Sequence, residues 1–144
     1  MTGIIVTGHG HFPSGLLSAV ALVAGRPENT AGVDFEEGVS TAGLKEAMLG
    51  AAESLEGDEI LILADLTGGT PFNVAAGLKT EYSGKKIKVI AGVNMAALVE
   101  AVFSRPMYGL DGLAKAVLAA GREGLKDLDS LDGGDEAPEF EDGL

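Results

Sequence analysis

Short apolar runs alternate with longer segments along most of the chain. The apolar runs predict four strands, at residues 3–8, 31–35, 59–64 and 86–91. The longer segments predict five helices, at residues 14–24, 41–55, 71–78, 94–103 and 110–128. Regular alternation of short strands and helices is typical of an α/β domain with a mostly parallel sheet and helices on both faces.

Residues that commonly begin helices support these boundaries. Thr70 is expected to cap the third helix with Pro71 in its first turn, and Asn94 is expected to open the fourth. Residues 59–64 are almost wholly apolar, as expected for a strand that is covered on both faces. The alternation of polar and apolar residues over 86–91 instead indicates a strand nearer the edge of the sheet.

The composition is that of a single domain. The chain has 144 residues, of which 46% are hydrophobic, and it contains no cysteine. Disulfides and thiolate metal sites are therefore excluded. We expect a cytoplasmic protein, because the chain starts directly with a strand and has no basic segment typical of a signal peptide. Nor does any apolar run approach the ~18–20 residues that would span a bilayer.

The negative charge is concentrated at the end of the chain. The net charge is −12, and residues 127–144 contain eight acidic residues without a lysine or arginine. Residues 1–126 then carry 14 acidic and 10 basic residues, a net charge of only −4. We expect one domain over residues 1–128 and an acidic, flexible tail over 129–144. Nucleic-acid binding is disfavoured, because no basic stripe with aromatic partners is present.

A histidine and an aspartate each follow an apolar strand. His9 ends the first run and Asp65 follows the third, and neighbouring parallel strands would bring both to one sheet edge. Asp65 would then accept a hydrogen bond from one ring nitrogen of His9 and leave the other as an unprotonated nucleophile. Taken singly, His9 could also be a histidine that bonds a neighbouring loop, and Asp65 a capping or loop carboxylate.

The residues after Asp65 are suited to anions. Two adjacent glycines immediately before a helix allow backbone amides to point at a phosphate, and the threonines on either side add hydroxyl donors. Glycine beside His9 allows close approach of a ligand. The alternative is an ordinary glycine turn with a capping threonine. The candidate phosphate-binding residues are Gly10, Thr67, Gly68, Gly69 and Thr70.

The second histidine, His11, is expected to be an exposed loop residue without a catalytic role. A pair of histidines two positions apart could suggest a metal site, but zinc needs three or four protein ligands. No clear cluster in the sequence supplies the others, so we predict neither a metal site nor a cofactor.

Three motifs resemble one known family. They are Gly8–Gly10 after the first strand, Asp65–Asn73 (DLTGGTPFN) after the third, and Val89–Asn94 (VIAGVN) around the end of the fourth. In this order and spacing, over residues 3–128, the chain resembles the IIA component of the mannose family of the phosphoenolpyruvate-dependent sugar phosphotransferase system (PTS). The segment Gly121–Leu125 also resembles the usual ending of the family.

The resemblance implies a flavodoxin-like three-layer sandwich, a homodimer and a phosphotransferase role. It identifies His9 as the phosphorylated residue, with Nε2 as the nucleophile, and Asp65 as the residue that orients it through Nδ1. The implied partners are the phosphocarrier protein HPr as donor and a IIB component as acceptor, and indirectly a membrane IIC/IID pair. Residues 138–144 look closest to the subgroup for N-acetylgalactosamine or related amino sugars.

Other families with similar features fit less well. The phosphohistidine module of phosphoenolpyruvate-dependent dihydroxyacetone kinases shares the strand-end histidine but lacks the GGTPFN run found at 68–73. A response-regulator receiver would phosphorylate the aspartate and hold Mg²⁺ with an acidic pair after the first strand, where this chain has Gly8–Gly10. A nucleotide-binding fold is the least supported alternative, because neither a GxGxxG motif nor a P-loop lysine motif is present.

Overall fold

The structure, a computed structural model, describes residues 1–131. Its strands are β1 (Gly3–His9), β2 (Thr30–Phe35), β3 (Glu59–Ala64) and β4 (Lys86–Ala91). Its α-helices are α1 (Phe12–Ala24), α2 (Thr41–Ser54), α3 (Thr70–Glu81), α4 (Met95–Ser104) and α5 (Leu110–Glu123). Two short 3₁₀ helices, η1 (Arg105–Met107) and η2 (Leu128–Ser130), follow α4 and α5.

The four strands form one parallel sheet in the order β2-β1-β3-β4. This arrangement confirms the predicted α/β fold and the edge position of β4. The central pair, β1 and β3, runs in register with Thr7 opposite Ala64. His9, the last residue of β1, and Asp65, the residue after β3, therefore lie side by side at the carboxyl end of the sheet.

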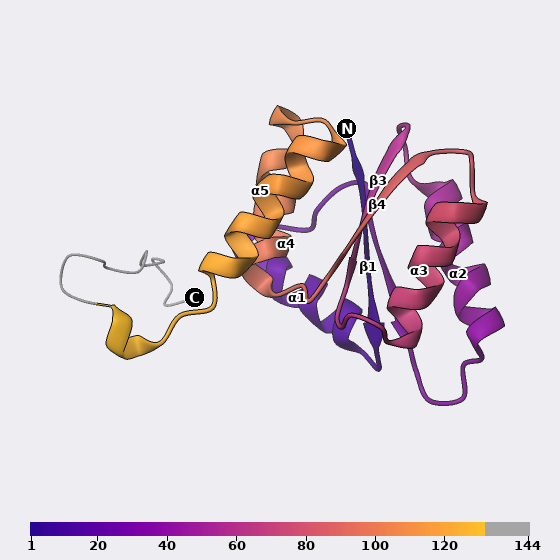
Figure 1. The fold of residues 1–144 in the computed structure, drawn as a ribbon, viewed down its shortest axis with the longest axis horizontal. Helices are drawn as coiled ribbons and strands as arrows, with labels where there is room; N and C mark the ends of the chain where they lie inside the picture. Colours follow the sequence, from indigo (N-terminus) through magenta and orange to yellow (C-terminus); the bar gives the residue numbers. More distant parts are fainter. Residues whose placement is uncertain (132–144) are drawn as a thin grey trace.

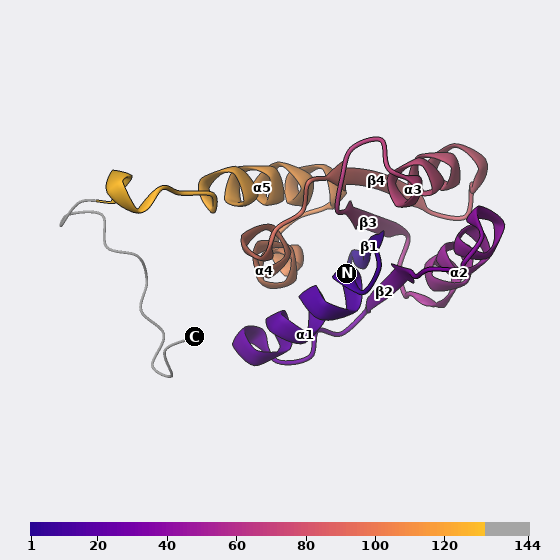
Figure 2. The same ribbon diagram turned by 90° about the horizontal axis from the view of Figure 1, so that it is seen from below.

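Helices cover both faces of the sheet and make a three-layer sandwich (Figure 1 and Figure 2). Successive strand residues point to opposite faces. On one face, Ile4 and Val6 pack with residues of α1, α4 and α5; on the other, Ile5 packs with residues of α2 and α3. These two apolar clusters fix the sheet, and with it the position of the loops at its carboxyl end. Within the described part of the chain, no helix is long and apolar enough to cross a membrane.

Side-chain caps begin two of the helices, α2 and, as predicted, α4. The Ser40 hydroxyl accepts a hydrogen bond from the Gly43 amide at 3.0 Å, and the Asn94 side chain accepts one from the Ala97 amide at 2.9 Å. Both bonds satisfy an amide that the first turn of a helix leaves free.

Several predicted helix boundaries are wrong. The first helix begins at Phe12 rather than residue 14, and the third ends at Glu81 rather than residue 78. The third helix is capped by Gly69, whose backbone is extended, so that Thr70 is already the first helical residue. The last helix ends at Glu123 with Gly124 as its C-cap, and does not continue to residue 128. The Gly124 amide donates to the Ala120 carbonyl at 2.9 Å and closes the last turn. The predicted domain limit at 128 and acidic tail 129–144 stay predictions, since most of the tail lies outside the described residues.

Candidate functional site

The site is built on the ends of β1 and β3. The Asp65 amide donates to the Thr7 carbonyl at 3.2 Å, which extends the ladder between the strands by one residue. In return, Asp65 Oδ2 accepts from the His9 amide at 2.9 Å and lies 2.7 Å from His9 Nδ1. Two contacts to one carboxylate oxygen fix both the backbone and the ring of His9. The structure thus brings together the pair that the strand pattern placed at one edge.

The contact with Asp65 determines the tautomer of His9. A carboxylate only accepts hydrogen bonds, so Nδ1 carries the proton and Nε2 keeps its lone pair. The His9 side chain is 46% exposed, whereas that of Asp65 is only 11% exposed. An oriented ring with an open, unprotonated nitrogen is suited to nucleophilic chemistry on a group that arrives from solvent.

Asp65 is held in its charged form. Burial alone would raise its pKa, but hydrogen bonds from the His9 amide and ring and from the Leu66 amide outweigh burial and lower the pKa below 3.8. The Leu66 amide donates to the other carboxylate oxygen, Oδ1, at 2.8 Å. A persistent negative charge beside Nδ1 would stabilise a positive imidazolium.

Acid titration checks this pairing. Because folding favours the charged carboxylate, the stability that it contributes is present above about pH 3.8 and is lost as pH falls through the lower, folded pKa. Carbon-13 NMR of the carboxyl groups should show Asp65 titrating below 3.8. His9→Ala should raise that pKa part of the way, since the hydrogen bonds from the backbone amides of residue 9 and Leu66 remain. An Asp65 pKa that does not respond to His9→Ala contradicts the ring–carboxylate contact.

Two further residues shape the pair. A Cβ atom at Gly8 would lie 2.9 Å from Asp65 Cγ and 2.9 Å from Phe12 Cδ1, so only glycine leaves room for the carboxylate here. The Phe35 ring, at the end of β2, meets the His9 ring edge-on with centroids 6.0 Å apart. The glycines beside His9 indicated close approach, but not that Asp65 is the group that approaches Gly8, nor that Phe35 faces the ring. The contact with Phe35 depends on the pairing of β2 with β1, which no local sequence pattern specifies.

The glycine turn reaches the exposed edge of the His9 ring. A Cβ atom at Gly69 would lie 2.8 Å from His9 Cε1 and 3.5 Å from Nε2. Gly68 has a φ of +81°, a left-handed conformation that favours glycine. The Asn73 side chain donates to the Gly68 carbonyl at 3.1 Å and ties the turn to α3. The N-terminus of α3 therefore starts beside the free nitrogen of His9.

The other candidate phosphate-binding residues take different positions. Thr67 is exposed in the turn, and Thr70 is half-buried at the start of α3. The Gly10 amide donates to the Phe35 carbonyl at 2.8 Å, so that amide is already engaged. Gly10 therefore provides open space rather than a free donor, because a Cβ atom there would meet no atom within 4 Å.

His11 stands apart from this pair. It is exposed, as predicted, and it immediately precedes α1 as the N-cap residue. Its ring contacts the carboxylates of Asp34, in the neighbouring strand β2, and of Glu36, the residue after that strand, not Asp65.

Comparison with known proteins identifies the family. The family model described as "PTS system fructose IIA component" matches residues 3–118. The chain belongs to this family. It is a mannose-family IIA component of the sugar phosphotransferase system, which confirms the resemblance seen in the sequence and agrees with a phosphocarrier function in sugar uptake.

Similar proteins support this assignment. The IIA component is 31% identical to the fructose-specific EIIA component of Bacillus subtilis, over 88% of this chain and 86% of that one. It is 36% identical to the mannose-specific EIIAB component of Escherichia coli over 89% of its own length, but spans only 40% of that longer protein. A crystal structure of component EIIA from Streptococcus agalactiae matches with 42% identity and a TM-score of 0.86, over 90% of this chain and 99% of that one.

Proposed function

We propose that this IIA component is a phosphoryl relay in which His9 is the acceptor. The phosphoryl group comes from a phosphohistidine on HPr and passes to a histidine on a IIB component. The observation that carries this proposal is the 2.7 Å contact between Asp65 Oδ2 and His9 Nδ1, which leaves Nε2 free. Family membership supports the choice of partners.

The transfer exchanges one nitrogen–phosphorus bond for another. The lone pair on Nε2 of His9 attacks the phosphorus as the bond to the HPr histidine breaks, and that bond's electron pair returns to the HPr nitrogen. No proton leaves Nδ1, so the phosphorylated ring is positively charged and Asp65 stabilises it. The second transfer, to IIB, reverses these roles and regenerates the neutral ring.

The turn before α3 supplies stabilisation for the phosphoryl oxygens. A phosphoryl group on Nε2 would lie beside the Gly68–Gly69 backbone, near the positive end of the α3 dipole. Thr67 and Thr70 add hydroxyl donors in this proposal, and Gly10 leaves space on the β1 side. Donors fixed before the reaction stabilise charge without reorganisation.

The wider assembly is also part of the proposal. The IIA component would act in the cytoplasm, dimerise with a second copy of itself, and serve a membrane IIC/IID pair only through IIB. Which sugar is taken up stays open at this level, because the IIA component handles phosphate alone. The amino-sugar assignment rests on residues 138–144, which lie outside the described residues.

The stability of the attached phosphate tests the chemistry. The chain is incubated with radiolabelled phosphoenolpyruvate, HPr and the enzyme that phosphorylates HPr, and purified IIB is then added. We expect a label that is labile in acid and stable in base, as for phosphohistidine, and that moves to IIB. A base-labile, acid-stable label would indicate an aspartyl phosphate, and a label that never reaches IIB would contradict the relay.

Gly69→Ala should slow phosphorylation about tenfold or more, because the new Cβ would lie 2.8 Å from His9 Cε1 and displace the ring. Gly77→Ala is the matched control: it adds the same methyl group within α3, where no atom lies within 4 Å. Stopped-flow transfer from phosphorylated HPr measures both. Equal rates for the two variants would show that the turn does not restrict the ring.

A further inference from the structure

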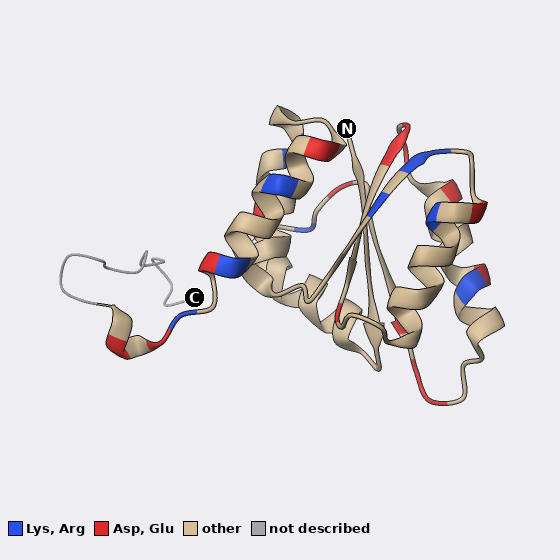
Figure 3. Cartoon of the chain, in the orientation of Figure 1, with Lys and Arg blue, Asp and Glu red and all other residues tan. Residues whose placement is uncertain are grey.

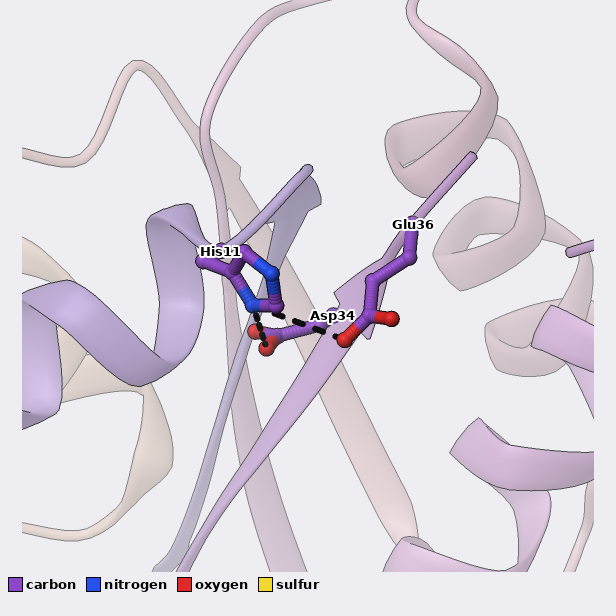
Figure 4. Close-up of side chains that lie close together, drawn as sticks. All are labelled: His11, Asp34 and Glu36. Atoms are coloured by element: carbon purple, nitrogen blue, oxygen red, sulfur yellow. Dashed lines mark hydrogen bonds and ion pairs between the residues drawn. The ribbon is translucent and has the colours of Figure 1, made fainter. Parts of the chain in front are cut away.

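A second histidine–carboxylate cluster lies on the other side of the end of β1. His11 Nδ1 is 3.2 Å from Asp34 Oδ2 and 3.4 Å from Glu36 Oε1 (Figure 4). The three ligand atoms lie within 4.8 Å of one another. His11 comes from the segment between β1 and α1, and the two carboxylates come from the end of β2 and the residue after it.

The backbone places these three side chains together. Asp34 and Glu36 are two positions apart on an extended segment, so they point to the same side. Phe35, between them, points the other way and contacts the His9 ring. The hydrogen bond from the Gly10 amide to the Phe35 carbonyl, at 2.8 Å, fixes the segment that carries His11 against the end of β2.

Asp34 is oriented by a further residue. Its Oδ1 accepts from the Ser14 amide at 3.0 Å, and its Oδ2 accepts from the Ser14 hydroxyl at 2.7 Å. Such outer contacts hold a carboxylate in one position and are characteristic of metal ligands in proteins. Ser14 belongs to the first turn of α1, so a regular helix supports the carboxylate.

We propose that His11, Asp34 and Glu36 form a site for a divalent transition metal ion such as Zn²⁺. Ligands about 2.0–2.1 Å from a tetrahedral zinc ion lie about 3.3 Å from one another. The observed separations of 3.2 and 3.4 Å match this spacing. Three protein ligands leave the fourth position to water. One imidazole with two carboxylates suits zinc better than Mg²⁺ or Ca²⁺, which prefer oxygen ligands alone.

Charge favours a cation over a second phosphoryl group at this position. Two carboxylates face one imidazole, so a net negative charge remains even when His11 is protonated. The loop that follows β2 is acidic (Figure 3). A phosphoryl group on His11 would be repelled by Glu36, whereas a dication would neutralise the cluster.

The sequence alone gives no clear cluster of ligands around His11, whereas the structure places two carboxylates beside its ring. Asp34 is 23 positions away from His11 in the sequence, and the contact depends on β2 pairing with β1. The proposal is independent of phosphoryl transfer, because none of the three ligands contacts Nε2 of His9 in the relay described above.

Calorimetric titration of the complete, metal-free chain with ZnCl₂ tests the site. We expect one saturable site with micromolar affinity, weakened at least tenfold by His11→Ala and by Glu36→Gln. Ser14→Ala removes the hydroxyl bond to Asp34 Oδ2 but keeps the amide bond to Oδ1, so it should weaken binding about tenfold. Glu37→Gln, which removes a neighbouring exposed charge outside the cluster, should bind as the unaltered chain does.

Several results would overturn the proposal. These are the absence of a saturable site, equal affinity in His11→Ala and Glu37→Gln, or loss of the site in His9→Ala, which would move the metal to the first pair. Circular dichroism of each variant establishes that it is folded. Phosphorylation by HPr, measured without added metal, tests the relay separately, so that either proposal can fail alone.

Discussion

Replacing His9 by alanine is expected to abolish phosphorylation of this IIA component by phosphorylated HPr. The variant lacks the Nε2 lone pair that forms the new bond. Any label on Asp65 would be distinguished because an aspartyl phosphate is acid-stable and base-labile. The measurement is incorporation of radiolabel from phosphoenolpyruvate, with the acid-labile fraction counted separately.

His11→Ala is the matched control for this experiment. Both histidines lie at the end of β1, but the His11 ring contacts Asp34 and Glu36 rather than Asp65. We expect this variant to retain labelling close to that of the unaltered chain. Undiminished labelling of His9→Ala, or loss of labelling in His11→Ala alone, would show that His9 is not the phosphoryl acceptor.

The second large effect is expected at Asp65. Asp65→Ala removes the partner that orients the ring and stabilises the imidazolium, so we expect the transfer rate to fall about a hundredfold or more. Asp65→Asn should be at least as slow. Its amide can donate to Nδ1, which favours the tautomer with the proton on Nε2 and removes the nucleophilic lone pair.

The fold should survive both changes, since Asp65 contacts the loop and ring rather than the apolar clusters. Thermal unfolding followed by circular dichroism establishes this, and rapid-quench transfer from phosphorylated HPr gives the rates. Asp111→Asn is the matched control. It removes an exposed carboxylate on α5 that pairs with Lys86 and Lys88 of β4, and it should not slow transfer. Transfer at the normal rate in Asp65→Ala would exclude Asp65 from the mechanism.

Much of the site follows from the sequence because it depends on buried strands. The almost continuous apolar run of β3 requires cover on both faces and a central place in the sheet. His9 and Asp65 each follow such a run, and parallel strands end at the same edge. Their convergence therefore needs only the pairing of β1 with β3, which the structure shows.

The rest depends on contacts that a linear pattern does not contain. Thr70 has the residue type of a cap, but the cap is Gly69 and α3 begins one position earlier than predicted. Gly69 takes this position where its backbone lies against the His9 ring. The grouping of His11 with Asp34 and Glu36 requires β2 to lie beside β1. The short sequence of β2 is too weakly apolar to specify its neighbour.

The position of the phosphoryl group on the histidine ring tests the central claim most directly. Nitrogen-15 and phosphorus-31 NMR of the chain phosphorylated through HPr correlates the phosphorus with one ring nitrogen. We predict a single phosphoryl group on Nε2 of His9, with the proton retained on Nδ1 facing Asp65. Phosphorus coupled to Nδ1 of His9, to a nitrogen of His11, or to no nitrogen would contradict the account.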